Sequence, residues 1–146
     1  MPADSDLPRR WRPLGTRFAA WFLFSALLLI SGASWVLLGE DIRSRIHPAS
    51  GVIVLILYAM GGAVVFALAR CRVDATEQGL VVINGYRRRE LAWAQVLGIT
   101  MPVGAPWAVL DLADGTSVSV IAIQASDGPR ARDAVHDIRA LIDRAA

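Results

Sequence analysis

The residues of this chain best suited to binding chemistry are arginines in two groups. Arg87, Arg88 and Arg89 follow one another on a stretch that reads as a strand. Planar guanidinium groups match phosphate oxygens, so this run is a candidate contact for an anionic lipid headgroup. Side chains alternate across a strand, however, which separates Arg88 from the other two and places it beside Glu90. The alternative is a solvated strand whose arginines discourage aggregation.

The second group lies near the start of the chain. Arg9, Arg10 and Arg12 surround Trp11, shortly before a long apolar run. An arginine immediately cytoplasmic of a membrane helix gains about 1 kcal/mol from anionic headgroups. These residues are therefore a second candidate lipid contact. The alternative is that they serve only as a signal for membrane topology.

No residue pattern indicates catalysis or a bound metal. Neither His47 nor His136 has a pattern of Cys, His or acidic residues around it with metal-ligand spacing: the acids beside His136 belong to a charged helix face that also carries arginines. The single cysteine, Cys71, excludes an internal disulfide and a multi-cysteine metal site. The chain has neither a nucleophile elbow nor a phosphate-binding glycine loop. We therefore expect no enzymatic activity and no cofactor.

Two uncharged apolar runs decide the class of the protein. Phe18–Leu38 has 21 residues and Gly51–Ala69 has 19. At about 1.5 Å per residue, each helix would span roughly 30 Å, the thickness of a bilayer's hydrocarbon core. A cleaved signal peptide is the alternative for the first run, but the run is long for that role and a second one follows. The sequence predicts a transmembrane hairpin.

The distribution of charge predicts the orientation of this hairpin. The chain has 15 arginines, no lysine and 13 acids, and its net charge of +2 comes from residues 1–17. Arginine-rich flanks stay cytoplasmic, and the loop 39–50 contains only two arginines. We expect a protein of the inner (plasma) membrane with both termini in the cytoplasm. The balanced charge of residues 70–146 argues against nucleic acid as a partner.

The second half of the chain alternates like a small β domain and ends in an amphipathic helix. Asn84-Gly85 and Asp114-Gly115 are hairpin-turn signals, and six or seven short strands are expected. After Pro129, apolar residues recur every three or four positions as far as Ala145. Such a helix covers an open end or face of the sheet that precedes it.

Several segments of this half resemble a known family. They are Glu77–Val82, Trp93–Val96, Trp107–Leu112, Asp114-Gly115 and Ala122–Gly128. Their order resembles a pleckstrin-homology (PH) domain, and in particular the bacterial PH-like family typified by a low-molecular-weight protein antigen of mycobacteria. The resemblance implies an α+β domain, a bent sheet or barrel of about seven antiparallel strands capped by the C-terminal helix. It also implies an actinobacterial, membrane-associated protein, and it carries over no catalytic residue.

These observations divide the chain into five predicted segments. They are a basic cytoplasmic tail (1–17), a transmembrane helix (18–38), an outer loop (39–50), a second transmembrane helix (51–69) and a cytoplasmic PH-like domain (70–146). The predicted function is that of a scaffold or adaptor, which binds a membrane or envelope protein through a strand edge or the loop Pro102–Pro106. The alternative is a sensor of anionic membrane lipids that uses Arg87–Arg89. Formation of a homo-oligomer stays open.

Overall fold

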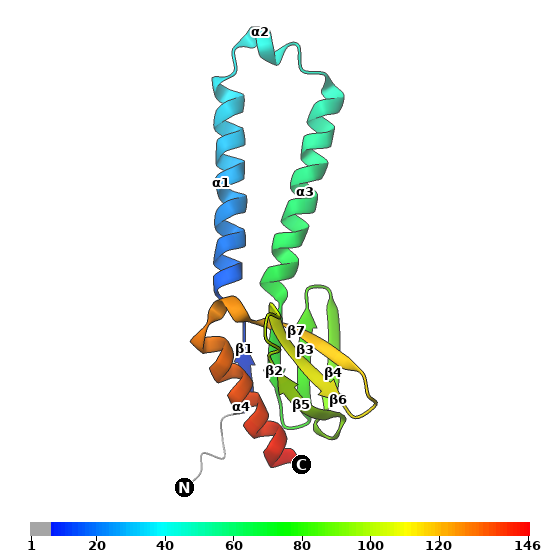
Figure 1. Ribbon diagram of the computed structural model, residues 1–146. Helices are drawn as coiled ribbons and strands as arrows, with labels where there is room; N and C mark the ends of the chain where they lie inside the picture. Colours follow the sequence, from blue (N-terminus) through cyan, green and yellow to red (C-terminus); the bar gives the residue numbers. More distant parts are fainter. Residues whose placement is uncertain (1–6) are drawn as a thin grey trace.

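A long helical hairpin stands on a small β domain in the computed structural model, which describes residues 7–146 (Figure 1). The long helices are α1 (Gly15–Leu37) and α3 (Pro48–Arg70), and the short helix α2 (Glu40–Arg43) lies in the loop between them. Both long helices contain the predicted apolar runs almost entirely and begin three residues earlier. Pro48 suits the first turn of α3, because it lacks the N–H that a first turn leaves without a partner.

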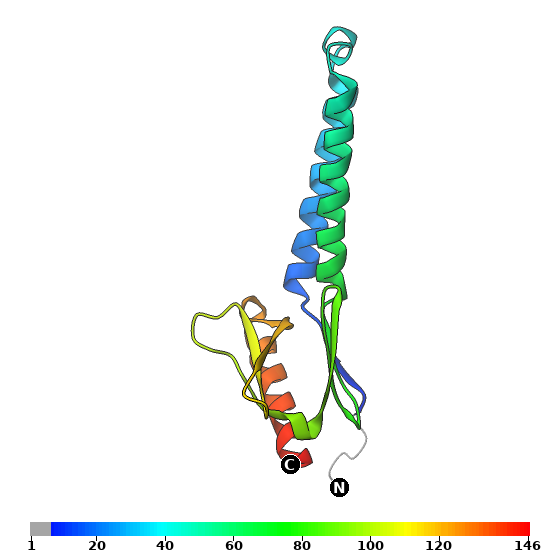
Figure 2. The ribbon, with the colours of Figure 1, turned by 90° about the vertical axis from the view of Figure 1, so that its right-hand side faces the viewer.

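The two long helices pack against each other and against little else. Figures 1 and 2 show them side by side, projecting away from the β domain. The ring of Phe24 lies over the glycines at 61 and 62 and meets the ring of Tyr58 edge-on at 6.4 Å, and Tyr58 also shares a hydrogen bond with Ser31. Most of their apolar side chains are exposed, so these are not core helices of a soluble domain. Each is long and apolar enough to cross a membrane.

Within residues 7–146, seven antiparallel strands form two sheets, followed by one helix. The first sheet has the order β1 (Arg9–Trp11), β2 (Arg72–Ala75), β3 (Gly79–Asn84), β4 (Arg87–Ala92). The second has the order β5 (Val96–Thr100), β6 (Trp107–Leu112), β7 (Ser117–Gln124). The chain then enters α4 (Pro129–Ala145). Figure 2 shows the two sheets facing each other, with α4 alongside. The predicted PH-like architecture is therefore confirmed.

The core lies between the two sheets and α4. Alternate residues of the strands are buried there, together with one stripe of the helix. The largest fully buried side chains of this core are Val73, Leu80, Val82, Ile99, Leu110, Val120 and Ile138. All the apolar positions that α4 buries belong to the repeat predicted from the sequence.

Strand β1 lies in the segment 1–17, which was predicted to be a cytoplasmic tail. β1 pairs antiparallel with β2, so that Arg9 lies opposite Ala75 and Trp11 opposite Val73. Residues 1–6 of that segment lie outside the described part of the chain. The four residues between Pro8 and Pro13 are too few to give a strand pattern, so the pairing could not be read from the sequence. As a result, the helical hairpin is inserted between two neighbouring strands of one sheet.

The turn between β3 and β4 differs by one residue from the prediction. Its two central residues are Gly85 and Tyr86 rather than Asn84-Gly85, and only Gly85 has a positive φ, of 63°. Asn84 instead ends β3 and uses its side chain, which donates to the carbonyl of Ser119 and accepts from the N–H of Ile121. The amide thus ties the first sheet to β7 of the second, a role that a local turn signal does not reveal.

Candidate functional site

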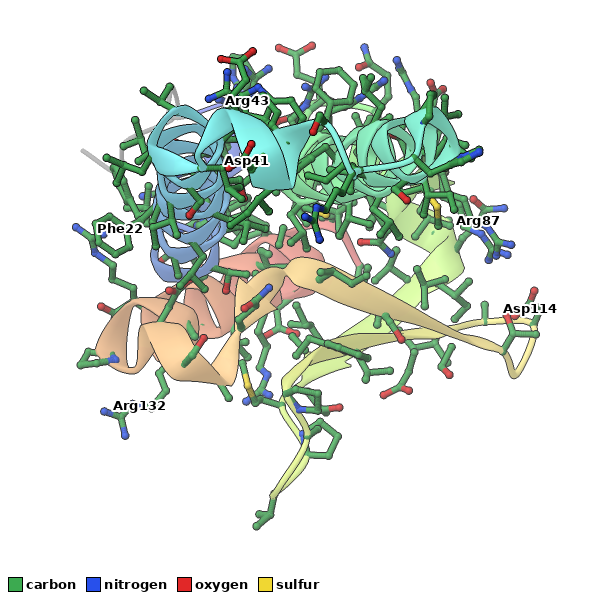
Figure 3. The ribbon with its side chains drawn as sticks, turned by 90° about the horizontal axis from the view of Figure 1, so that it is seen from above. Phe22, Asp41, Arg43, Arg87, Asp114 and Arg132 are labelled. Atoms are coloured by element: carbon green, nitrogen blue, oxygen red, sulfur yellow. The ribbon has the colours of Figure 1, made fainter. Side chains whose placement is uncertain are left out.

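The predicted arginine run lies on β4, at the edge of the first sheet. All three arginines are exposed, but they do not converge on one ligand. Arg88 pairs with Glu90 at 2.6 Å across the same face of the strand. Arg87 points outward on the α3 side of the molecule (Figure 3). The structure therefore brings the three residues onto one edge but not into one phosphate clamp.

Arg89 lies on the face of β4 opposite to that of Arg88, and its charge affects Asp114 in the β6–β7 turn. The hydroxyl and N–H of Thr116 donate to Asp114 at 2.7 and 2.9 Å and hold the pKa of that carboxyl below its ordinary value. The positive charge of Arg89 lowers the same pKa by a smaller amount. Arg89 and Asp114, together with Leu91 and Leu112, line a groove of about 550 Å³ between the two sheets.

The edge of β4 offers backbone hydrogen-bonding groups to a partner. In a two-residue hairpin, the closing pair, here Asn84 and Arg87, exchanges hydrogen bonds across the ladder. The alternation along the strand then turns the N–H and C=O of Arg88 and Glu90 outward. Further along, the N–H of Ala92 is already taken by the side chain of Gln95 at 2.9 Å. A short stretch centred on Arg88–Glu90 is thus available for pairing with another strand.

Edges of the second sheet are partly occupied by side chains. Arg139 of α4 donates to the carbonyl of Ile99 at the edge of β5, at 2.8 Å. Asn84 occupies backbone groups of β7 in the same way. These contacts reduce what β5 and β7 can offer to another strand, so β4 is the better candidate for strand addition.

The N-terminal arginines are tied into the fold. Arg10 forms an ion pair with Asp74 at 2.6 Å, and Arg72 approaches the same carboxylate at 3.0 Å. Arg9 reaches Asp137 of α4 at 3.5 Å. These pairs fasten β1 to β2 and to α4. A lipid contact through this group stays a prediction, and two of its three members have partners inside the protein.

A cleft of about 440 Å³ lies between β1, β7 and the first half of α4. Its apolar walls include Trp11, Ile123 and Ala134. Both signs of charge lie around it: Arg10, Arg12, Arg130, Asp127, Asp133 and Asp137. The sequence did not reveal this cleft, because its walls come from opposite ends of the chain. Because both arginines and aspartates line the cleft, it favours neither an anionic nor a cationic ligand.

Among residues 7–146, no three His, Cys, Asp or Glu side chains gather where they could hold a metal ion. His47 is instead the N-cap of α3 and accepts the N–H of Ala49 at 3.2 Å. Trp93 is half-buried against the core and donates from its ring nitrogen to the carbonyl of Thr76 at 3.1 Å. These residues have structural roles.

Cys71 lies at the junction of α3 and β2 and is buried. Its sulfur accepts the N–H of Gly85 at 3.2 Å and contacts the carbonyl of Ala67 at 3.5 Å. Burial raises the pKa of the thiol, and the hydrogen bonds from the backbone of Gly85 and of Cys71 itself only partly offset that effect. A neutral, buried thiol is a poor nucleophile, so Cys71 fixes the junction rather than taking part in chemistry.

Comparisons with known proteins support the fold. Residues 70–141 match the family described as bacterial PH domain. Uncharacterized proteins of Mycobacterium bovis and Mycobacterium tuberculosis are 36% identical over 150 residues, covering 98% of this chain and 92% of each relative. No solved structure was found to match. PH domains are typically non-catalytic interaction modules. The chain belongs to the bacterial PH domain family.

Proposed function

We propose that this protein is a membrane-anchored adaptor that holds a protein partner at the cytoplasmic face of the inner membrane. In this proposal the α1–α3 hairpin crosses the bilayer, and the β domain lies in the cytoplasm. The partner is an extended segment of another membrane or envelope protein, which adds as a strand to the edge of β4. Main-chain hydrogen bonds supply affinity in this binding mode, and side chains on the edge supply selectivity.

The observation that carries this proposal is the pairing of β1 with β2. Because the hairpin leaves and re-enters the same sheet, the domain is attached to the membrane at two points and cannot swing on a flexible linker. In that sheet two strands separate β4 from β1, so β4 is held close to the bilayer. A weak edge contact then suffices, since anchoring raises the local concentration of any other membrane protein.

The charge on β4 favours an acidic partner segment. Arg87, Arg88 and Arg89 are exposed along the edge, and Glu90 offsets only part of their charge. A strand with acidic side chains would pair with these arginines, whereas a second copy of β4 would place like charges near one another. The arrangement therefore favours a different protein over self-association through this edge.

A test of the adaptor uses a photoreactive residue at Glu90 of the full-length protein in cells. We expect one discrete crosslinked product from this position and none from a matched probe at Ser117, which is exposed on β7. Arg88→Pro in the same chain should abolish the product, because proline removes an outward N–H without breaking the ladder with β3. Arg88→Ala keeps that N–H and should preserve most of the product.

Two results would contradict the adaptor. One is a Glu90 probe that gives no discrete product, and the other is a product that survives Arg88→Pro. Circular dichroism of the purified Arg88→Pro protein checks that the fold is intact.

The second candidate is a sensor of anionic lipid headgroups, and the position of Arg87 favours it. The preceding residue, Tyr86, donates from its hydroxyl to the carbonyl of Ala63 in α3, at 2.9 Å. Arg87 therefore lies beside the last turns of a proposed membrane helix, at headgroup depth. In nanodiscs, a fluorophore at Tyr86→Cys should then respond to anionic lipid, and salt should weaken the response. Replacing all three β4 arginines by alanine should remove it.

A further inference from the structure

Strand direction places the β5–β6 loop at the end of the domain where the helical hairpin is attached. β2 starts directly after α3, so each later antiparallel strand alternately leaves and returns to that end. The β3–β4 turn, the β5–β6 loop and the β7–α4 connection all lie there. Two of them contact the hairpin: Tyr86 reaches Ala63 of α3, and Asp127 accepts the N–H of Gly15 at 3.2 Å. Figure 2 shows the third, the β5–β6 loop, reaching out sideways.

The tip of this loop is apolar and rigid. The carbonyl of Pro102 accepts the N–H of Ala105 at 3.0 Å, and Gly104 has φ +80°. A positive φ at the third residue of a four-residue turn is the signature of type II. The turn presents Val103, which is fully exposed. No charged residue occurs between Val96 and Leu110. Presenting this side chain to an apolar environment therefore requires little ordering of the backbone.

Charge is distributed unevenly between the two ends of the domain. At the end that carries the hairpin, the connecting segments and the residues that flank them contain six arginines and one acid: Arg12, Arg17, Arg70, Arg72, Arg87, Arg130 and Asp127. At the opposite end, the β2–β3 and β6–β7 turns contain Glu77 and Asp114 and no basic residue. The end next to the hairpin thus matches an anionic lipid surface, whereas the turns of the far end carry only acidic charge.

We propose that the β5–β6 loop is a third membrane contact, in which Val103 enters the interface of the bilayer that the hairpin crosses. A single exposed valine is ordinary on a protein surface. Here it stands at the tip of a preformed turn, on an uncharged loop, at the end of the domain that carries the hairpin and six arginines. The domain would then contact the membrane at a third point, to one side of the two connections that join β1 and β2 to the hairpin. The tilt of the domain, and with it the position of β4, would then be fixed relative to the membrane.

This inference rests on the proposed insertion of the hairpin, and the test separates the two. The full-length protein is reconstituted into vesicles that contain anionic lipid, with an environment-sensitive fluorophore at Val103→Cys. Cys71 is buried and contributes little labelling. Ala113→Cys, in the exposed β6–β7 turn, is the matched control, and Leu29→Cys, in α1, reports on the hairpin. Nitroxide-labelled lipids quench any fluorophore that lies in or near the acyl region.

We expect quenching at position 103 to be several times that at position 113, with emission shifted to shorter wavelength. Position 29 should be quenched most strongly. Equal, weak quenching at 103 and 113 with strong quenching at 29 overturns the loop contact but leaves the membrane anchor intact. This result would also follow if the loop bound a protein instead of lipid. Weak quenching at position 29 overturns the anchor itself.

Discussion

At the residue scale, Gly79 is the position where the backbone tolerates least change. It begins β3 with φ +156°, and a Cβ there would lie 2.0 Å from the carbonyl oxygen of Leu91. That oxygen belongs to the backbone of the neighbouring strand and cannot move aside without breaking the ladder. The glycine is therefore required both by its dihedral angle and by the close approach of β4.

We predict that Gly79→Ala destabilises the domain by about 3 kcal/mol or more, the combined effect of a strained dihedral and an overpacked contact. Gly98→Ala is the matched control, because Gly98 is also in a strand, has an ordinary φ and has open space where its Cβ would lie. Denaturant unfolding of both proteins in detergent measures the difference. Equal denaturation midpoints for the two variants would contradict this prediction, because they would show that the nearby carbonyl of Leu91 does not penalise a Cβ at position 79.

The buried thiol of Cys71 predicts a loss of stability at alkaline pH. Its pKa in the folded protein is raised above the ordinary value of 9.0, so the folded state holds its proton more tightly than the unfolded state. The stabilising contribution of this tighter proton binding to the free energy of unfolding is fully present below pH 9. It is lost as the pH rises through the pKa of the thiol in the folded protein. The free energy of unfolding should therefore fall more steeply above pH 9 in the wild type than in Cys71→Ser. Parallel pH profiles would contradict the assignment.

At the scale of elements, β1 shows what the sheet requires. The strand is only three residues long, but Trp11 packs against the core and the Arg10–Asp74 pair closes the outer side. Without β1, the backbone of β2 would become an open edge beside the buried residues Val73 and Ala75. The domain boundary drawn at residue 70 from the sequence therefore omits one strand of the folded unit.

This arrangement predicts which soluble fragment folds. Residues 72–146 alone should aggregate or remain partly unfolded, because they lack β1. Residues 7–13 joined by a short flexible linker to residues 71–146 should fold cooperatively, since Trp11 lies opposite Val73 and the hairpin is replaced by a turn. Thermal unfolding followed by circular dichroism compares the two fragments. If both unfold with the same midpoint, β1 contributes nothing to the domain.

On the scale of the whole molecule, the hairpin and the sheet constrain each other. In the proposed membrane arrangement, both ends of the α1–α3 hairpin lie on the same side of the bilayer, because β1 and β2 are paired. The charge pattern favours the cytoplasmic side for these ends, because they are rich in arginine and the loop that contains α2 has as many acids as arginines. The proposed cytoplasmic location of the domain depends on this bias.

Labelling in intact spheroplasts tests the orientation. Ser44→Cys lies in the exposed loop after α2, and Ser117→Cys is exposed on β7. An impermeant maleimide should label position 44 and reach position 117 only after lysis. Native Cys71 cannot report the orientation because it is buried on either side. Labelling of position 117 before lysis, with none at 44, would reverse the topology.

The sequence by itself determined the local features: two long apolar helices, the strands and turns of the second half, and the stripe of α4. These depend on composition and on periods of two and 3.6 residues, so a short window contains the information. Only the tertiary structure decided that β1 joins a strand more than 60 residues away, that Cys71 is buried, and that Asn84 ties the first sheet to β7. It also placed the loop around Val103 at the end that carries the hairpin. Such facts follow from the packing of distant segments, and no local pattern encodes which segments meet.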